Sequence, residues 1–369
     1  MSTRKNILYA IVLVLLFINP VHGAVRIIIA ENGGAQGLIE HTLPALTLAA
    51  AQGVDYLEIS VVATADSELV VLNDITLNRL TDVAAVFPGR GRDDGNYYAI
   101  DFTLSELRQL RLTQVFDTSP VPLSLAIPSL KEELSLIRRL ETLLLRQVGL
   151  VLEIKKPWFH NDEGKDISTL ILDTLQLFDY ASPKDKIYLQ CYDPEELQRI
   201  HSLLPQKQMN LPLIQRIGRN EGQETRQRNA DGWEPYSYDW LFTNIGLRMV
   251  ASYSYGIALP RETIADEHGT LLLNDYFDSA HSHGLKVLVF SENSSEKSGG
   301  SQPDLPALLE LYTKAGIDGL YTDSFHVVKQ ALEAGAETEK RDTDLPQFFS
   351  DLELSRPSPN GQTPASDMH

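Results

Sequence analysis

The sequence predicts an α/β protein, a (β/α)8 TIM barrel that carries an inserted subdomain between its second and third strands. Eight short segments rich in Val, Ile and Leu recur along the chain, as expected for strands that are buried on both faces. Amphipathic segments with helical periodicity separate them. Glycine follows the expected helix just before three of the strands, at Gly53, Gly284 and Gly316. Eightfold alternation of strand and helix is typical of a closed parallel barrel.

The elements are expected in the following order along the chain. The strands span Val25–Ala30, Tyr56–Val62, Gly149–Ile154, Lys186–Cys191, Leu211–Ile217, Tyr255–Leu259, Leu285–Phe290 and Ile317–Thr322. The clearest helices span Leu43–Gln52, Leu130–Leu145, Ile167–Phe178, Pro194–Leu203 and Leu305–Ala315.

Two regions exceed what a plain barrel needs. The stretch from Asn73 to about Pro128 is too long for an ordinary connection, and we interpret residues 74–128 as the inserted subdomain, with an extra strand at Leu69–Leu72. Residues 220–239 are polar and contain glycine. This composition predicts a lid-like loop near the mouth of the barrel.

The two ends of the chain differ in composition from the barrel, which we place at residues 24–335. Arg4 and Lys5 precede a short apolar run, Ile7–Ile18, and small residues follow it. This pattern predicts a signal peptide over residues 1–23 and a periplasmic or secreted protein. The run is shorter than the roughly 20 residues that span a bilayer, so no stable membrane span is expected after cleavage. An uncleaved anchor is the alternative. Residues 336–369 are acidic and rich in Pro and Ser, which predicts a disordered tail.

Charge and cysteine content exclude some classes of partner. The formal net charge is −18 over 369 residues, and it becomes −20 without Arg4 and Lys5. A chain this acidic has no electrostatic footprint for nucleic acid or for anionic lipid surfaces. Cys191 is the only cysteine, so no internal disulfide can form.

Candidate site residues follow from the rule that barrel enzymes place their chemistry at the carboxyl ends of the strands. The rule selects Glu31, Asn32, Glu58, Ser60, Glu153, Lys155, Gln190, Gln215, Thr322 and Asp323. Charged residues inside apolar strands are costly unless they are paired. Glu153 and Lys155 could therefore be structural ion partners at the rim, or they could belong to an active site.

Several motifs indicate a family. They are Glu40–Ala45 (E-H-T-L-P-A), Asp55–Glu58 (D-Y-L-E), Tyr97–Leu104 (Y-Y-A-I-D-F-T-L), Glu153–His160 (E-I-K-K-P-W-F-H), Tyr188–Asp193 and Tyr238–Trp240. Over roughly residues 26–330 the chain resembles the periplasmic-type glycerophosphodiester phosphodiesterases. The resemblance implies hydrolysis of deacylated phospholipids such as glycerophosphocholine to glycerol 3-phosphate and an alcohol.

The resemblance also implies a set of working residues, and this chain departs from it. Members use two histidines as general acid and base, and a divalent cation, often Ca²⁺, held by Glu, Asp and a second Glu. The Glu ligands correspond to Glu58 and Glu153, while Ser60 stands where the family has Asp. Glu31 and Asn73 stand at the two histidine positions, and Asn32 replaces an arginine. The substrate-binding positions correspond to Asn32, Lys155, Trp158, Phe159 and Gln190.

These replacements predict a family scaffold with a degenerate catalytic site that binds a glycerophosphodiester, a metal or a partner. Asn73 cannot transfer a proton, and Glu31 would be a poor acid at neutral pH unless burial raised its pKa. Glu31 could also complete a calcium site with Glu58 and Glu153; Ca²⁺ and Mg²⁺ are the expected cofactors, if the site binds one. The alternatives are an altered metal-dependent phosphodiesterase that uses Glu31 or His41, and a non-catalytic interaction module.

Overall fold

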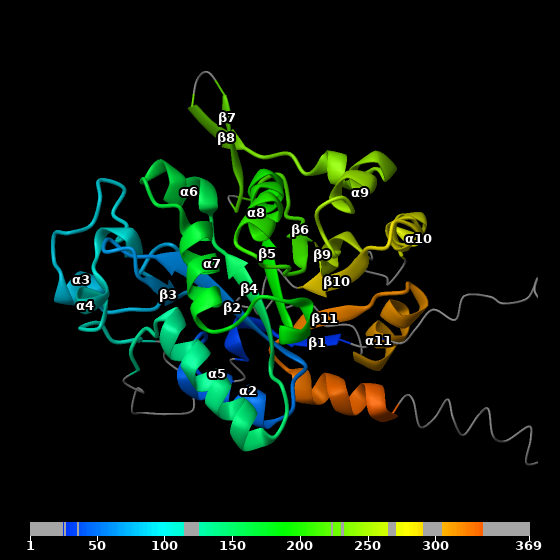
Figure 1. Ribbon diagram of the computed structural model, residues 1–369, viewed down its shortest axis with the longest axis horizontal. Helices are drawn as coiled ribbons and strands as arrows, with labels where there is room; N and C mark the ends of the chain where they lie inside the picture. The colour runs from blue at the N-terminus through cyan, green and yellow to red at the C-terminus, as the bar shows by residue number, and fades with distance from the viewer. Residues whose placement is uncertain are drawn as a thin grey trace, which may run out of the picture.

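Eight parallel strands close into a barrel in the computed structural model (Figure 1). The strands are β1 (Ile27–Ala30), β2 (Tyr56–Ala63), β4 (Gly149–Ile154), β5 (Ile187–Cys191), β6 (Leu213–Arg216), β9 (Gly256–Pro260), β10 (Lys286–Phe290) and β11 (Gly319–Thr322). β1 pairs with β2 on one side and with β11 on the other, and these two pairings close the sheet. The structure describes residues 25, 27–34, 37–113, 125–222, 224–229, 232–264, 271–290 and 305–334.

The predicted barrel is confirmed strand by strand. β4 has the predicted bounds, and the ends of the other seven strands differ from prediction by at most two residues. Nearly every strand residue is buried, because helices cover the outer face and packed side chains fill the inside. The predicted signal peptide and acidic tail lie outside the described residues and stay predictions.

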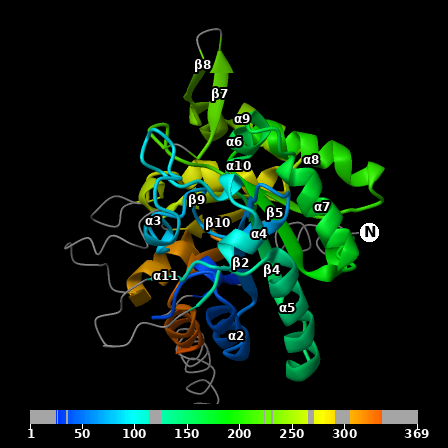
Figure 2. The same cartoon turned by 90° about the vertical axis from the view of Figure 1, so that its left-hand side faces the viewer.

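Helices surround the strands in both views (Figures 1 and 2). They are α2 (Leu43–Ala51), α5 (Leu130–Leu144), α6 (Pro157–Asp162), α7 (Ile167–Leu177), α8 (Pro194–Gln206), α9 (Asn244–Val250), α10 (Asn274–Ser282) and α11 (Leu305–Lys314), and residues 325–334 are also helical. Short 3-10 turns are η1 (Glu31–Gly33), η2 (Ala99–Asp101), η3 (Pro183–Asp185), η4 (Asp239–Phe242) and η5 (Arg261–Thr263). None of the helices in the described part of the chain is long and apolar enough to cross a membrane.

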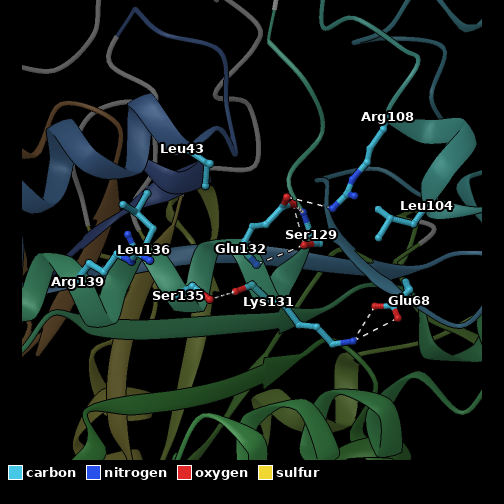
Figure 3. A pocket seen from close by; sticks show the side chains of 10 residues that line it. All are labelled: Leu43, Glu68, Leu104, Arg108, Ser129, Lys131, Glu132, Ser135, Leu136 and Arg139. Carbon is cyan, nitrogen blue, oxygen red and sulfur yellow. Dashed lines mark hydrogen bonds and ion pairs between the residues drawn. The ribbon is translucent and has the colours of Figure 1, made fainter.

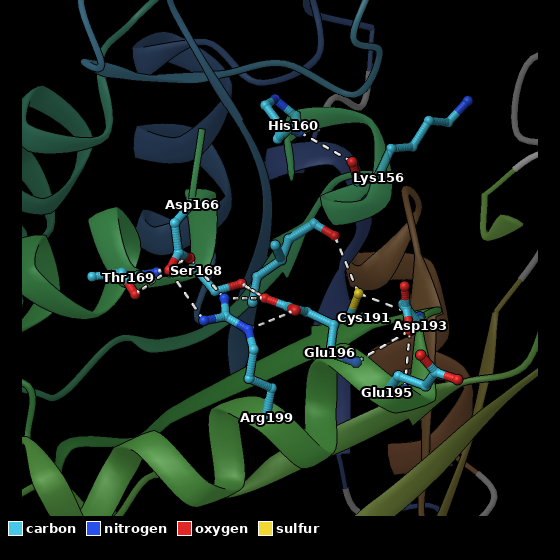
Figure 4. A network of polar contacts seen from close by, with 11 residues as sticks. Lys156, His160, Asp166, Ser168, Thr169, Cys191, Asp193, Glu195, Glu196 and Arg199 are labelled. Atoms are coloured by element: carbon cyan, nitrogen blue, oxygen red, sulfur yellow. Dashed lines mark hydrogen bonds and ion pairs between the residues drawn. The ribbon is translucent and has the colours of Figure 1, made fainter. Parts of the chain in front are cut away.

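Local sequence determines where the long helices begin. Ser129 and Glu132 form a reciprocal capping box at the start of α5. Asp193 accepts hydrogen bonds from two backbone N–H groups at the start of α8. Figure 4 shows how α7 and α8 are joined: Ser168 of α7 donates to Glu196 of α8, and Arg199 of α8 donates to Asp166, which caps α7. These bonds fix the helices that follow β4 and β5.

The inserted region adds a small second core to the barrel. β3 (Leu69–Val71) pairs antiparallel with β2, and α3 (Val83–Val86) and α4 (Leu104–Leu107) follow. Phe102 is fully buried in this core. Arg92 of the insertion pairs with Glu163 after α6 at 2.5 Å. The insertion is therefore held against the side of the barrel where β4 ends.

Residues 220–239, predicted as a lid-like loop, differ from that prediction. They contain a hairpin of β7 (Arg226–Asn229) and β8 (Gly232–Pro235), which projects from one end of the molecule in both views (Figures 1 and 2). Polar cross-strand pairs, such as Gln227 with Glu234, connect the two exposed strands, so the sequence shows no apolar alternation. Trp233 of β8 packs on Trp158 of α6, with ring centroids 5.3 Å apart.

Candidate active site

The carboxyl ends of the strands bring most of the predicted residues together inside the barrel mouth. Glu58 of β2, Glu153 of β4 and Gln190 of β5 are all at most 2% exposed. The Gln190 side-chain amide donates to Glu58 Oε1 at 3.3 Å and lies 3.5 Å from Glu153 Oε2. The Asn32 backbone N–H donates to Glu58 Oε2 at 2.7 Å. The predicted carboxylates therefore form one buried cluster.

Arg216 of β6 lies at the centre of this cluster, and sequence reasoning missed it. Its Nη1 lies 2.8 Å from Glu153 Oε2 and 3.4 Å from Glu58 Oε1. Gln215, which precedes Arg216 and which the carboxyl-end rule selected, does not join the cluster. Its side-chain amide donates to backbone carbonyls, including that of Tyr192 at 3.1 Å. Successive side chains of a strand point to opposite faces, so only one of this polar pair could face inward.

The two buried carboxylates respond differently to this environment. Burial raises the pKa of Glu58, and the nearby Glu153 carboxylate adds to the effect. Burial acts in the same direction on Glu153, but Lys155 and Arg216 outweigh it and hold the pKa of that carboxyl below its usual range. Glu153 is therefore the more acidic member of the pair.

Glu31 occupies one of the two predicted acid–base positions. It lies in η1, directly after β1, and is 7% exposed. Burial raises the pKa of its carboxyl to about 7; Arg216 opposes the shift, and Asp323, Glu153 and Glu262 add to it. A carboxyl with this pKa can exchange a proton at neutral pH. Burial thus supplies the condition under which Glu31 could act as an acid or base.

The second predicted acid–base position holds a group that cannot titrate. Asn73 is partly buried two residues after β3, where the Leu72 N–H bonds to the Ser60 carbonyl at 2.9 Å. Ser60 itself is fully buried, and its hydroxyl has no hydrogen-bond partner among the described residues. Ser60 lies within β2 and Asn73 follows the paired strand β3, and neither side chain adds charge.

His41 is buried with both ring nitrogens lacking a partner in the described part of the chain. Burial lowers its pKa to about 4, although Glu40 acts in the opposite direction. The backbone N–H of His41 donates to the Asn32 carbonyl at 3.0 Å, so His41 lies next to η1. Its imidazole is neutral at pH 7 and too weakly basic to be matched to that pH.

The hairpin covers the other cation of the site. Lys155 Nζ contacts Glu153 Oε1 at 2.8 Å and Glu224 Oε2 at 3.2 Å, and Glu224 comes just before β7. The Trp158 indole N–H donates to the Glu224 carbonyl at 3.2 Å, so this predicted binding residue lies beside the mouth. Phe159 instead stacks on Tyr98 of the insertion, with centroids 5.2 Å apart.

These residues do not fit a divalent cation as they are arranged. All four carboxylate oxygens of Glu58 and Glu153 already have donors from the chain. These donors are Arg216, Lys155, Gln190 and the backbone N–H of Asn32. Ca²⁺ and Mg²⁺ need several oxygen ligands at about 2.0 to 2.6 Å. Among the described residues, no group of three or more His, Cys, Asp or Glu side chains is placed to hold a metal ion.

A separate hollow of about 560 Å³ lies on the flank of the molecule beside α5 (Figure 3). It contains none of the predicted site residues. Lys131 there pairs with Glu68 at 2.9 Å, and Arg108 pairs with Glu132 at 3.1 Å. Because none of the predicted site residues lines this hollow, the barrel mouth remains the stronger candidate.

Comparisons with known proteins agree with the resemblance. The model of the glycerophosphoryl diester phosphodiesterase family matches residues 32–327. A glycerophosphodiester phosphodiesterase of Treponema pallidum is 42% identical over 247 residues, which cover 63% of this chain and 69% of that protein. One from Haemophilus influenzae is 40% identical over 247 residues, covering 63% of this chain and 68% of the relative.

Solved structures show the same fold at low identity. A phosphodiesterase of this type from Silicibacter pomeroyi has a TM-score of 0.60 at 19% identity, over 85% of this chain and 95% of the other. An Oleispira antarctica phosphodiesterase, solved with its product sn-glycerol-3-phosphate, has a TM-score of 0.56 at 18% identity, over 84% and 97% of the two chains.

Proposed function

Because the chain belongs to the glycerophosphoryl diester phosphodiesterase family, we propose that it binds a glycerophosphodiester or glycerol 3-phosphate at the barrel mouth, with little or no hydrolysis. The observation that carries the proposal is the make-up of this mouth. It holds two buried cations, Lys155 and Arg216, but only one of the two acid–base positions can transfer a proton. Export is part of the proposal and is supported by the apolar run Ile7–Ile18; N-terminal sequencing of the mature chain tests it.

Binding is supported by charge and by the relative that was solved with glycerol 3-phosphate. A phosphodiester is an anion, and buried cations neutralise it more effectively than exposed ones do. Arg216 and Lys155 are 5% exposed, and Trp158 bonds through its indole N–H to Glu224, whose carboxylate contacts Lys155. A glycerol moiety or its alcohol substituent could pack on that indole ring while the phosphate meets the cations.

Weak turnover follows from the requirements of the reaction. The leaving alkoxide of a phosphodiester must be protonated, and the attacking water must lose a proton. Asn73 can do neither. Loss of one acid–base group costs about 10² to 10⁴ in rate.

A second candidate function, slow hydrolysis by Glu31, is favoured by one observation. Burial raises the pKa of the Glu31 carboxyl to about 7. At this pKa about half of the molecules carry the proton at pH 7, so the group could act either as the acid or as the base. A substrate anion would change this pKa further.

One experiment tests both functions. Titration calorimetry with glycerol 3-phosphate and with glycerophosphocholine, in EDTA and in Ca²⁺, is expected to show binding in both media. Release of glycerol 3-phosphate from glycerophosphocholine is expected to be at or near background. Any residual hydrolysis rate should change with pH around the Glu31 pKa near 7. It should disappear in Glu31→Gln and persist in the exposed control Glu310→Gln. Absence of binding, or fast turnover that depends on metal, would refute the binder proposal.

Glu224 is expected to compete with an anionic ligand for Lys155. Its carboxylate is about one-third exposed and lies 3.2 Å from the Lys155 ammonium. Exposed or partly exposed ion pairs contribute about 0.2 to 1 kcal/mol, so Glu224→Gln should tighten glycerol 3-phosphate binding by roughly 1.5- to 5-fold. Calorimetry at low salt measures this change. Glu234→Gln, on β8 of the same hairpin, is the matched control and should leave the affinity unchanged.

A further inference from the structure

The guanidinium of Arg216 lies in a cage that is built for a cation. Two carboxylate oxygens, from Glu58 and Glu153, contact Nη1 at 3.4 and 2.8 Å. Three aromatic rings surround its carbon Cζ, with centroids at 3.9 Å for Phe290, 4.9 Å for Tyr192 and 5.4 Å for Tyr321. Carboxylates and ring faces together select a positively charged, planar group.

We propose that Arg216 is the resident cation of this site, standing between Glu58 and Glu153 where a divalent ion would otherwise bind, so that the chain binds its phosphoryl ligand without metal. The inference deepens the proposed function. Its first readout, metal binding, does not need the phosphoryl ligand.

The hydrogen bonds leave no room for a divalent ion beside Arg216. A cation that bridged Glu58 and Glu153 would have to approach oxygens that already contact Nη1. The remaining oxygens accept from Lys155 Nζ at 2.8 Å and from the Asn32 N–H at 2.7 Å. An ion would therefore have to displace donors that belong to the chain itself.

The surroundings of the guanidinium also favour an organic cation. Arg216 Nε is buried with no hydrogen-bond partner among the described residues, and the centroid of the Phe290 ring lies 3.9 Å from Cζ. A hydrated ion would lose its water there without gaining oxygen ligands. A guanidinium is weakly hydrated and stacks on aromatic rings, so it loses less.

Charge balance gives the consequence of removing Arg216. With both carboxylates ionised, Glu58 and Glu153 are balanced by Lys155 and Arg216. Without Arg216 one buried negative charge is uncompensated, which strongly destabilises a folded protein. A divalent ion could then restore the balance, because its ligands Glu58 and Glu153 are freed. The Arg216→Leu variant should therefore acquire a metal requirement that the natural chain lacks.

The test compares Ca²⁺ and Mn²⁺ binding to the full chain and to Arg216→Leu by calorimetry and thermal unfolding. The natural chain should show no binding below millimolar concentrations and no change in Tm. Arg216→Leu should bind at least tenfold more tightly. Its Tm should fall by about 5 °C or more in EDTA and recover with Ca²⁺, since 1 kcal/mol shifts the Tm of a large domain by roughly 2 to 4 °C.

Three controls isolate the role of the guanidinium. Arg248→Leu removes one exposed positive charge from α9 and should gain no metal site. Arg216→Lys keeps the buried charge and should therefore gain no metal site. The double variant Glu58→Gln, Arg216→Leu keeps the charge balanced with one carboxylate fewer, so it should fold and bind no metal.

Two results would overturn the proposal. One is Ca²⁺ binding by the natural chain that is lost in Glu58→Gln, and this result decides the matter even if Arg216→Leu does not fold. The other is a folded Arg216→Leu that binds metal no better than the natural chain. Failure of glycerol 3-phosphate to bind in EDTA, together with a metal site gained in Arg216→Leu, would refute the proposed function and leave Arg216 as the resident cation.

Discussion

Restoring the residues that the resemblance implies at the reactive positions is expected to raise the rate of glycerol 3-phosphate release from glycerophosphocholine by at least about 10² to 10⁴ in the presence of Ca²⁺. The rebuilt chain combines Glu31→His, Asn32→Arg, Ser60→Asp, Asn73→His and Arg216→Leu. The measurement is single-substrate turnover with Ca²⁺ and again with EDTA.

The expected gain has two physical sources. Histidines at positions 31 and 73 supply an acid and a base whose unperturbed pKa is near neutrality. An aspartate at position 60 joins Glu58 and Glu153, so that three carboxylates face a cation once Arg216 no longer contacts two of them. A metal there neutralises charge that develops on the phosphoryl group in the transition state.

The four-residue version that retains Arg216 is the decisive control. It carries both histidines but should gain little, because the guanidinium still contacts Glu58 and Glu153. Equal activity of the two versions would show that Arg216 does not obstruct the metal. A folded rebuilt chain without activity would show that the positions assigned from the resemblance do not act together.

The fold was predictable because its strands are buried on both faces. Long runs such as Gly149–Ile154 and Leu285–Phe290 have no polar face, and this pattern is typical of barrel strands. The carboxyl-end rule then found Glu58, Glu153, Lys155 and Gln190, because polar residues in such strands are few. The hairpin at residues 226–235 escaped prediction because exposed strands leave no apolar pattern.

Arg216 and the pKa of Glu31 needed the structure, for different reasons. Gln215 and Arg216 are adjacent polar residues, and the predicted strand Leu211–Ile217 gives no register that says which one faces inward. Charge balance was the available sign of a second buried cation, because the carboxylates of Glu58 and Glu153 need two cations and Lys155 supplies only one. The pKa of Glu31 depends on how deeply η1 is buried, which no local pattern reports.

Glu133→Gln is expected to stabilise the chain by about 3 kcal/mol at pH 7. Glu133 lies on α5, is fully buried, and neither carboxylate oxygen has a hydrogen-bond partner among the described residues. Burial raises its pKa from 4.5 to about 8. Folding at pH 7 must therefore protonate a carboxyl that is ionised in the unfolded chain, and glutamine removes this requirement at almost unchanged volume.

The sign of the pH dependence follows from the raised pKa of Glu133. The contribution to stability is fully present below the unfolded pKa near 4.5 and is lost as the pH rises through the folded pKa near 8. The natural chain and Glu133→Gln should therefore have similar free energies of unfolding near pH 4, diverge between pH 4.5 and 8, and run parallel above that. Urea unfolding at several pH values measures the difference, and exposed Glu221→Gln should change stability by less than about 0.5 kcal/mol. Parallel curves from pH 4 upward would show that Glu133 keeps its ordinary pKa and that another group balances its charge inside the fold.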